Sequence, residues 1–170
     1  MKNYSLPYIP KESFSEIKKI LNSGKINYWN GNVTKKFESA FANYIGKKFG
    51  IAVNSGTTAL ELSLRSIGIS KNDEIITTPR SYISSATSIS MLNAVPVFCD
   101  IDINTQNINC NEIPNLITSK TKAIIAVSLF GQCCDFDNLN KVLRHTNISL
   151  IEDAAQSFGS VYKNRKSCSF

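Results

Sequence analysis

The sequence predicts an α/β fold, a mainly parallel sheet with helices on both faces, and two observations carry that prediction. Short apolar runs typical of strands alternate with amphipathic stretches typical of helices along most of the chain. Polar residues directly follow two of the apolar runs: the segment 54–57 opens a helical stretch, and Asp153 follows the run from Ile148 to Ile151. Open α/β sheets bind ligands at the carboxyl ends of their strands. We therefore expect the functional residues in the loops that follow the strands.

Two helices are expected before this alternation begins. Apolar residues recur at helical spacing from Phe14 to Leu21 and from Val33 to Ile45, and a glycine follows each stretch as a stop signal. The strands expected after them lie near 48–53, 74–78, 95–99, 122–128 and 148–152. The helices expected between the strands lie near 57–67, 82–93, 111–117 and 136–145. Right-handed crossovers place the loops that follow the strands on one edge of the sheet.

Composition narrows the class of protein. A chain of 170 residues is long enough for one domain and short for two, and its apolar fraction of 42% is ordinary for a soluble protein. The net charge of +6 fits attraction to an anionic ligand such as a nucleotide diphosphate, or a simple bias toward Lys, Asn and Ile. Because the lysines form no basic stripe, we expect no nucleic-acid binding. The sequence has no signal-peptide core and no apolar run of membrane-spanning length, so we expect a cytoplasmic protein without a membrane anchor.

The cysteines indicate reduced thiols. There are five of them, with no CxxC pair, and an odd number does not suit a disulfide framework. The adjacent pair Cys133-Cys134 is expected to be structural rather than redox-active. No metal site is expected.

The segment Ser55-Gly56-Thr57 lies where a strand-like run gives way to a helix. Free backbone N–H groups and the helix dipole at such a junction favour a phosphate, and glycine lets the backbone approach it closely. The alternative is plain helix capping, because Ser and Asn are ordinary N-cap residues.

Six segments together, in this order and spacing, resemble the DegT/DnrJ/EryC1/StrS family of sugar aminotransferases, which use pyridoxal phosphate (PLP). They are Asn54-Ser-Gly-Thr-Thr-Ala-Leu60, Asp73-Glu-Ile-Ile-Thr77, Pro96-Val-Phe-Cys-Asp-Ile-Asp102, Thr121-Lys-Ala-Ile-Ile125, Ser128-Leu-Phe-Gly131 and Glu152-Asp-Ala-Ala-Gln-Ser-Phe-Gly159. The resemblance implies a type I PLP-transferase-like large domain that is incomplete at the C-terminus. Residues 1–170 would be the N-terminal part of that PLP-binding domain, with the C-terminal remainder absent.

The resemblance also implies roles for five residues. Gly56 and Thr57 would hold the cofactor phosphate, and Tyr82 would stack on the ring. Asp153 would pair with the ring nitrogen, where a carboxylate favours the protonated form, and Gln156 would lie beside the ring oxygen. Each residue also has an ordinary alternative: Asp153, with its neighbour Glu152, could cap a turn, Tyr82 could be a core aromatic, and Gln156 could face solvent.

The activity that the resemblance implies is transfer of an amino group from glutamate to a keto group on a nucleotide-linked deoxysugar. Such sugars supply surface polysaccharides and other glycosylated products. The stretch from Lys25 to Gly31 is most similar to perosamine synthases within the family. A homodimer is expected for the full-length protein.

Two departures from the family pattern affect this expectation. Ser128 occupies a place where many relatives carry His, which leaves the local substrate contacts open. The Schiff-base lysine of the family falls beyond Phe170, so we expect this chain alone to be inactive, with exposed apolar patches that favour self-association. Lys163 and Lys166 flank an expected hairpin turn at Asn164-Arg165 and do not match that lysine.

Two other functions remain open from the sequence. One is a PLP-dependent ketosugar dehydratase, because related proteins replace the lysine by His. The other is a non-catalytic module that binds PLP or a nucleotide through the 55–57 segment.

Overall fold

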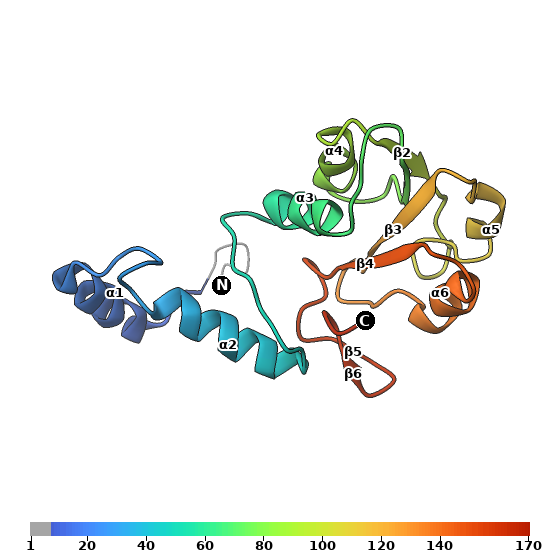
Figure 1. Ribbon diagram of the computed structural model, residues 1–170. Coiled ribbons are helices and arrows are strands. Elements are labelled where there is room, and N and C mark those ends of the chain that lie inside the picture. The colour runs from blue at the N-terminus through green and yellow to red at the C-terminus, as the bar shows by residue number, and fades with distance from the viewer. Residues whose placement is uncertain (1–7) are drawn as a thin grey trace. The chain divides into compact units, whose positions relative to one another are not determined.

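The computed structural model describes residues 8–170, and the chain divides between Ala52 and Val53 into two units (Figure 1). The first unit holds helices α1 (Lys11–Ser23) and α2 (Val33–Ile45), both as predicted. Each helix ends at a glycine in the left-handed region, Gly24 with φ 66° and Gly46 with φ 72°. A left-handed residue closes a helix because it turns the chain away and lets its N–H reach the last carbonyls.

Helix α1 presents its apolar residues to solvent. None of its residues is buried, and Phe14, Ile17 and Leu21 are all more than half exposed. The expectation of exposed apolar patches is therefore confirmed, while self-association stays a prediction.

The second unit carries the predicted α/β architecture. Its elements are α3 (Gly56–Ser66), β1 (Glu74–Thr77), α4 (Ser84–Ser90), β2 (Val95–Phe98), α5 (Ile113–Leu116), β3 (Thr121–Val127), α6 (Phe136–Leu143), β4 (Ser149–Asp153), β5 (Val161–Tyr162) and β6 (Arg165–Lys166). The first four strands form one sheet in the order β2-β1-β3-β4, and every pair in it is parallel. Among residues 8–170, no helix is long and apolar enough to cross a bilayer.

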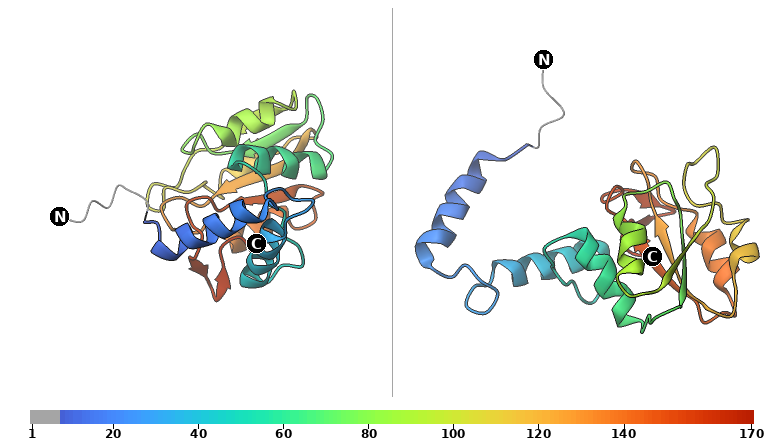
Figure 2. Two further views of the ribbon diagram at one scale, coloured as in Figure 1. Left: turned by 90° about the vertical axis from the view of Figure 1, so that its left-hand side faces the viewer. Right: turned by 90° about the horizontal axis from the view of Figure 1, so that it is seen from above.

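Helices cover both faces of this sheet, and a separate core lies on each face. Alternate residues of a strand point to opposite faces, so Ile75 packs with α3 and α4, whereas Ile76 packs with α5 and α6. The central strand β3 contributes to both cores, and its five residues from Ala123 to Val127 are all buried. The right-hand view of Figure 2 shows α3 and α4 on one side of the strands and α5 and α6 on the other.

The strand predicted near 48–53 does not form. Within the described chain, no strand lies beside this segment, and the side chains of Phe49 and Ile51 are 74% and 82% exposed. The Ala52 N–H donates to Glu38 Oε1 at 2.9 Å instead of joining a ladder. An apolar run signals a strand only where a neighbouring strand takes up its backbone groups.

The hairpin turn lies one residue earlier than predicted. Strands β5 and β6 pair Val161 with Lys166 and Tyr162 with Arg165, which leaves Lys163 and Asn164 as the turn residues. Both have positive φ, 46° and 67°, as a two-residue type I′ turn requires. Arg165 and Lys166 are therefore strand residues rather than turn residues.

The last residues of the chain are held by Glu152 and by an aromatic cluster. Glu152 Oε1 accepts hydrogen bonds from Ser167 Oγ at 3.0 Å and the Cys168 N–H at 2.8 Å, and Oε2 accepts from the Phe170 N–H at 3.1 Å. The Phe170 ring stacks on buried Phe136 with ring centroids 4.1 Å apart. Glu152 therefore does not cap the turn after β4; it joins that strand to residues 167–170.

Replacing Glu152 by Gln should lower the free energy of unfolding by about 1–3 kcal/mol. The amide keeps one acceptor oxygen, but its NH2 group then faces N–H and O–H donors that lose their partner. Urea denaturation measures the change. The control is Glu112→Gln, at an exposed carboxylate directly before the short helix α5 that caps no main-chain group of the helix, which should change stability by less than about 0.5 kcal/mol. Equal effects of the two substitutions would contradict this role of Glu152.

Candidate functional site

Three strands bring their carboxyl ends to one edge of the sheet. Strands β1, β3 and β4 are adjacent and parallel, with Val127 and Asp153 paired at the ends of β3 and β4. The loops that follow them, 78–83, 128–131 and 154–156, therefore start at the same edge. Helix α3 leads through a short connection to the first residue of β1, so its C-terminus faces the opposite edge and its N-terminus faces this one (Figure 1). The predicted convergence of these segments is confirmed, although the chain before Asn54 is not a strand.

The N-terminus of α3 supplies free hydrogen-bond donors. Ser55 is the N-cap residue, and its Oγ accepts from the Thr58 N–H at 3.2 Å. The N–H groups of Gly56 and Thr57 precede the first intrahelical bond, and neither has a partner within residues 8–170. A Cβ built on Gly56 would meet no atom within 4 Å, so the space above the helix end is open. Capping and anion binding are therefore compatible here, since they use different N–H groups.

Asp153 is partly used and partly free. Its Oδ1 accepts from the Ala155 N–H at 3.1 Å, so the turn-capping alternative is correct for this oxygen. Oδ2 has no hydrogen-bond partner among the described residues. The main-chain oxygen of Asp153 accepts from the Ser128 N–H at 3.0 Å, which joins the end of β4 to the loop after β3. One carboxylate oxygen thus remains for a ligand, on a residue whose backbone is fixed.

Gln156 is hydrogen-bonded to the loop after β3, so its side chain does not simply face solvent. Its Oε1 accepts from the Phe130 N–H at 3.2 Å, and its main-chain oxygen accepts from the Gly131 N–H at 2.9 Å. A backbone N–H can only donate, so the amide atom that faces Phe130 must be Oε1. The Nε2 group then points the other way, as a donor.

Tyr82 is not a core aromatic. Its side chain is 73% exposed in the loop before α4, so the ring is available to stack on a ligand. The Arg80 guanidinium of the same loop lies 5.9 Å from the centre of the Phe130 ring in the neighbouring loop. Hydrogen bonds join Asp153 and Gln156 through the loop after β3, whereas Gly56, Thr57 and Tyr82 share no hydrogen bond with them in residues 8–170.

Ser128 has a structural role. It is fully buried, and its Oγ accepts from the Cys134 N–H at 3.1 Å, which closes the segment 128–134. Its hydroxyl therefore supports the loop after β3 and does not face a ligand.

Burial raises the pKa values of the thiols around the sheet. All five cysteines are free, and burial raises the pKa of Cys134 to about 12 and those of Cys99 and Cys110 to about 11. A thiol with a raised pKa stays protonated near neutral pH, which removes its nucleophilic form.

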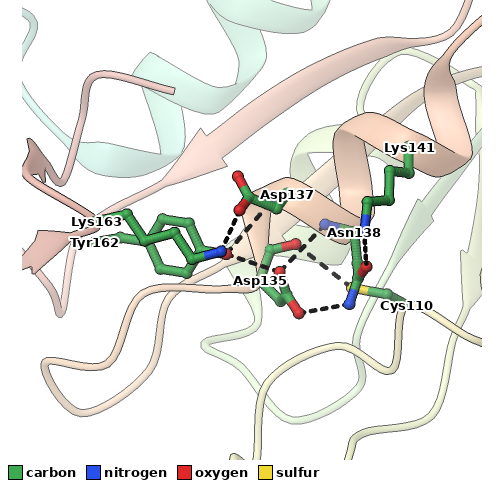
Figure 3. Close-up of polar contacts among 7 residues, drawn as sticks. All are labelled: Cys110, Asp135, Asp137, Asn138, Lys141, Tyr162 and Lys163. Atoms are coloured by element: carbon green, nitrogen blue, oxygen red, sulfur yellow. Dashed lines mark hydrogen bonds and ion pairs between the residues drawn. The ribbon is translucent and has the colours of Figure 1, made fainter.

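A second polar cluster, at the start of α6, was not predicted from the sequence (Figure 3). The Tyr162 hydroxyl donates to Asp135 Oδ1 at 2.8 Å, and Lys163 forms an ion pair with Asp137, so the β5–β6 hairpin is held against the start of α6. Burial acts to raise the pKa of Asp135, but hydrogen bonds from Tyr162 and Asn138 outweigh it and lower that pKa.

A cavity of about 760 Å³ lies beside this cluster, and none of the five predicted site residues lines it. The cavity therefore lies beside the contacts that hold the hairpin and does not coincide with the predicted site. Lys163, committed to Asp137, is not presented to the strand ends.

The donors at the sheet edge fit pyridoxal phosphate by their chemistry. The free N–H groups of Gly56 and Thr57 suit a phosphate, the free oxygen of Asp153 suits a protonated ring nitrogen, and the Gln156 amide suits a ring oxygen. No group of three or more His, Cys, Asp or Glu residues in the described part of the chain could hold a metal ion.

Comparison with known proteins identifies the family. The model of the DegT/DnrJ/EryC1/StrS aminotransferase family matches residues 7–170. The chain belongs to this family. GDP-perosamine synthase of Caulobacter vibrioides is 45% identical over 81% of the chain and 37% of the relative. The solved aminotransferase of Psychrobacter cryohalolentis superposes with a TM-score of 0.91 at 38% identity, over 94% of the chain and 40% of that structure.

A dehydratase has the same fold as this DegT/DnrJ/EryC1/StrS chain. A structure of GDP-4-keto-6-deoxymannose-3-dehydratase with a trapped PLP-glutamate geminal diamine superposes with a TM-score of 0.86 at 30% identity, over 94% of the chain and 42% of that structure. The chain spans between 37% and 42% of the length of the curated relatives that it matches.

Replacing Ser55 by Ala should lower the free energy of unfolding by about 1 kcal/mol, because the Thr58 N–H loses its capping oxygen. Thermal and urea denaturation measure the loss. The matched control is Ser63→Ala, at a half-buried serine inside α3 whose hydroxyl only bonds back to the Ala59 carbonyl. The control should be neutral or slightly stabilising, because Ala is the better helix former. A stable Ser55 variant would contradict the capping role.

Proposed function

We propose that this chain is the cofactor-binding N-terminal part of a PLP-dependent aminotransferase that acts on a nucleotide-linked keto-deoxysugar. The observation that carries the proposal is the free oxygen of Asp153 on the same sheet edge as the oriented Gln156 amide. Membership of the aminotransferase family and the share of the relatives' length that the chain covers support it.

Each residue has a defined task in this proposal. The N–H groups of Gly56 and Thr57 and the positive end of α3 hold the phosphate. Tyr82 covers one face of the ring. Asp153 Oδ2 keeps the ring nitrogen protonated, because its negative charge raises the pKa of that nitrogen.

Gln156 Nε2 donates to the ring oxygen and fixes the tilt of the ring. When bound, PLP supplies an electron sink for proton removal at the carbon that bears the amino group.

The substrates are proposed from the relatives. One is a GDP-perosamine synthase, and another is a UDP-2-acetamido-2-deoxy-3-oxo-D-glucuronate aminotransferase of Pseudomonas aeruginosa. A further relative is a spore coat polysaccharide biosynthesis protein of Bacillus subtilis. These names support a nucleotide-linked ketosugar as acceptor and polysaccharide synthesis as purpose. We also propose glutamate as donor, a homodimer for the full-length protein and a cytoplasmic location.

A ketosugar dehydratase is the second candidate, because such an enzyme superposes on the chain. It would use the same phosphate, ring-nitrogen and ring-oxygen contacts. Amino transfer is preferred because the perosamine synthase is 45% identical, against 30% for the dehydratase structure. A non-catalytic PLP-binding module is the third possibility, and it would bind the cofactor without turnover.

Residues 1–170 should bind PLP without forming one stoichiometric lysine adduct. Lys163 is held by Asp137, and the loops at the strand ends that carry the candidate site, 78–83, 128–131 and 154–156, contain no lysine. The test is incubation with PLP, borohydride reduction and mass spectrometry, with an assay of amino transfer from glutamate to a GDP-linked 4-keto-6-deoxysugar. Scattered, substoichiometric labelling without transfer is expected. A single full adduct accompanied by transfer would show that the chain carries its own catalytic lysine.

Replacing Asp153 by Asn should weaken binding of pyridoxamine phosphate, the amine form of the cofactor, by about tenfold, because the amide supplies no charge for the ring nitrogen. Stability should change little, since Asn Oδ1 still accepts from the Ala155 N–H. Isothermal titration and thermal denaturation measure the two effects. Asp102→Asn is the control, because Asp102 also caps a local turn, through the N–H groups of Asn104 and Thr105. Unchanged affinity in the Asp153 variant would contradict the contact with the ring nitrogen and leave Asp153 only its role as a turn cap.

A further inference from the structure

Asn107 makes a set of contacts that the proposed chemistry does not use. Its side chain is 2% exposed, yet it comes from the segment between β2 and α5, far in sequence from the loop that it touches. Its Oδ1 accepts from the Leu129 N–H at 3.0 Å, and its Nδ2 donates to the carbonyls of Gln132 at 3.0 Å and Cys133 at 3.3 Å. One buried carboxamide thus bonds the first and last residues of a single turn, which we call the 129–132 turn, and the carbonyl of the residue that follows it. Such a buried amide is kept in place because any unmade bond would leave a polar group without water.

The 129–132 turn needs outside support. Phe130 has φ 52° and Gly131 has φ 82°, so two successive residues lie in the left-handed region. That conformation is unfavourable for a bulky residue such as Phe. The Phe130 side chain is 73% exposed, so burial of its ring does not hold the turn. Within the turn itself, the main chain contributes a bond from the Gln132 N–H to the Leu129 carbonyl at 2.8 Å.

The 129–132 turn sets the orientation of the Gln156 side chain. The Phe130 N–H donates to Gln156 Oε1, and the N–H of the next residue, Gly131, donates to the main-chain oxygen of Gln156, so two successive N–H groups of the turn hold this residue. If the turn relaxed, Oε1 would lose its donor and the amide could rotate. The Nε2 group would then no longer be held in one direction.

We propose that Asn107 is a positioning residue for the cofactor site: its buried carboxamide fixes the 129–132 turn, and the turn fixes the direction in which Gln156 presents its N–H donors. The proposal rests on the proposed function, in which Gln156 donates to the ring oxygen of the cofactor. Asn107 itself touches no ligand and acts through Phe130 and Gln156.

The test is a double-mutant cycle between Asn107 and Gln156, read as the affinity for pyridoxamine phosphate. This probe binds without a covalent link to lysine, so the measurement does not depend on turnover. Asn107→Ala should weaken binding by about fivefold, as expected for coupled residues in one network. In a Gln156→Ala background, Asn107→Ala should cause less than about a twofold further change. Hydrogen exchange at the Phe130 and Gly131 amides should speed up in both backgrounds.

A general structural role predicts a different outcome. If Asn107→Ala lowers the affinity by the same factor with and without Gln156, the positioning role is overturned. Asn109→Ala is the matched control in the same segment, because its Oδ1 accepts only the nearby Asn111 N–H at 3.1 Å; it should leave the affinity unchanged.

Should Asn107→Ala not fold, Asn107→Asp serves in the same cycle. It keeps the acceptor for Leu129 but cannot donate to Gln132 and Cys133. The failure of the proposed function is distinguishable from the failure of this inference. An unaltered chain that does not bind pyridoxamine phosphate overturns the cofactor site, and the inference with it. Binding without coupling between the two positions overturns the inference alone.

Discussion

Parallel pairing of β3 with β1 on one side and β4 on the other is the constraint on which the rest of the second unit depends. The middle of β3 is buried on both faces, so its apolar residues separate two cores while their backbone groups are shared between two ladders. A strand in this position cannot shift by one residue without moving its side chains to the wrong face. That fixed register places Val127 beside Asp153 and brings the loops after β3 and β4 together.

The site at this edge is assembled from main-chain contacts more than from side-chain pairs. The ends of β3 and β4 are joined by the hydrogen bond from the Ser128 N–H to the Asp153 carbonyl. Gln156 accepts hydrogen bonds from two N–H groups of the 129–132 turn. Ser55 Oγ caps only the Thr58 N–H and leaves the N–H groups of Gly56 and Thr57 free, and Asp153 gives Oδ1 to Ala155 and leaves Oδ2 free. The structural caps therefore leave groups for the proposed ligand contacts, so the two interpretations of the sequence do not exclude each other.

Glu152 and Asp153 show how neighbouring carboxylates acquire different tasks. Successive residues of β4 point to opposite faces, so Glu152 turns toward residues 167–170 while Asp153 ends the strand at the functional edge. An apolar run by itself does not make a strand. The run at 48–53 is apolar, as β3 is, but no strand in residues 8–170 pairs with it, and Phe49 and Ile51 are exposed to solvent.

The sequence by itself determined the elements whose signals are local. Helical periodicity and the stop glycines located α1 and α2, and continuous apolar runs located β1, β3 and β4. The motif order predicted the family, and the strand ends predicted the edge where the candidate residues lie. Tertiary structure alone decided what depends on distant partners: that 48–53 is not a strand, that the hairpin turns at Lys163-Asn164, and that Asn107 holds the 129–132 turn. Hydrogen bonds between segments more than twenty residues apart leave no periodic pattern in the sequence, which is why the sequence predicted the shared edge of the sheet but not the contacts of Asn107 with the loop after β3.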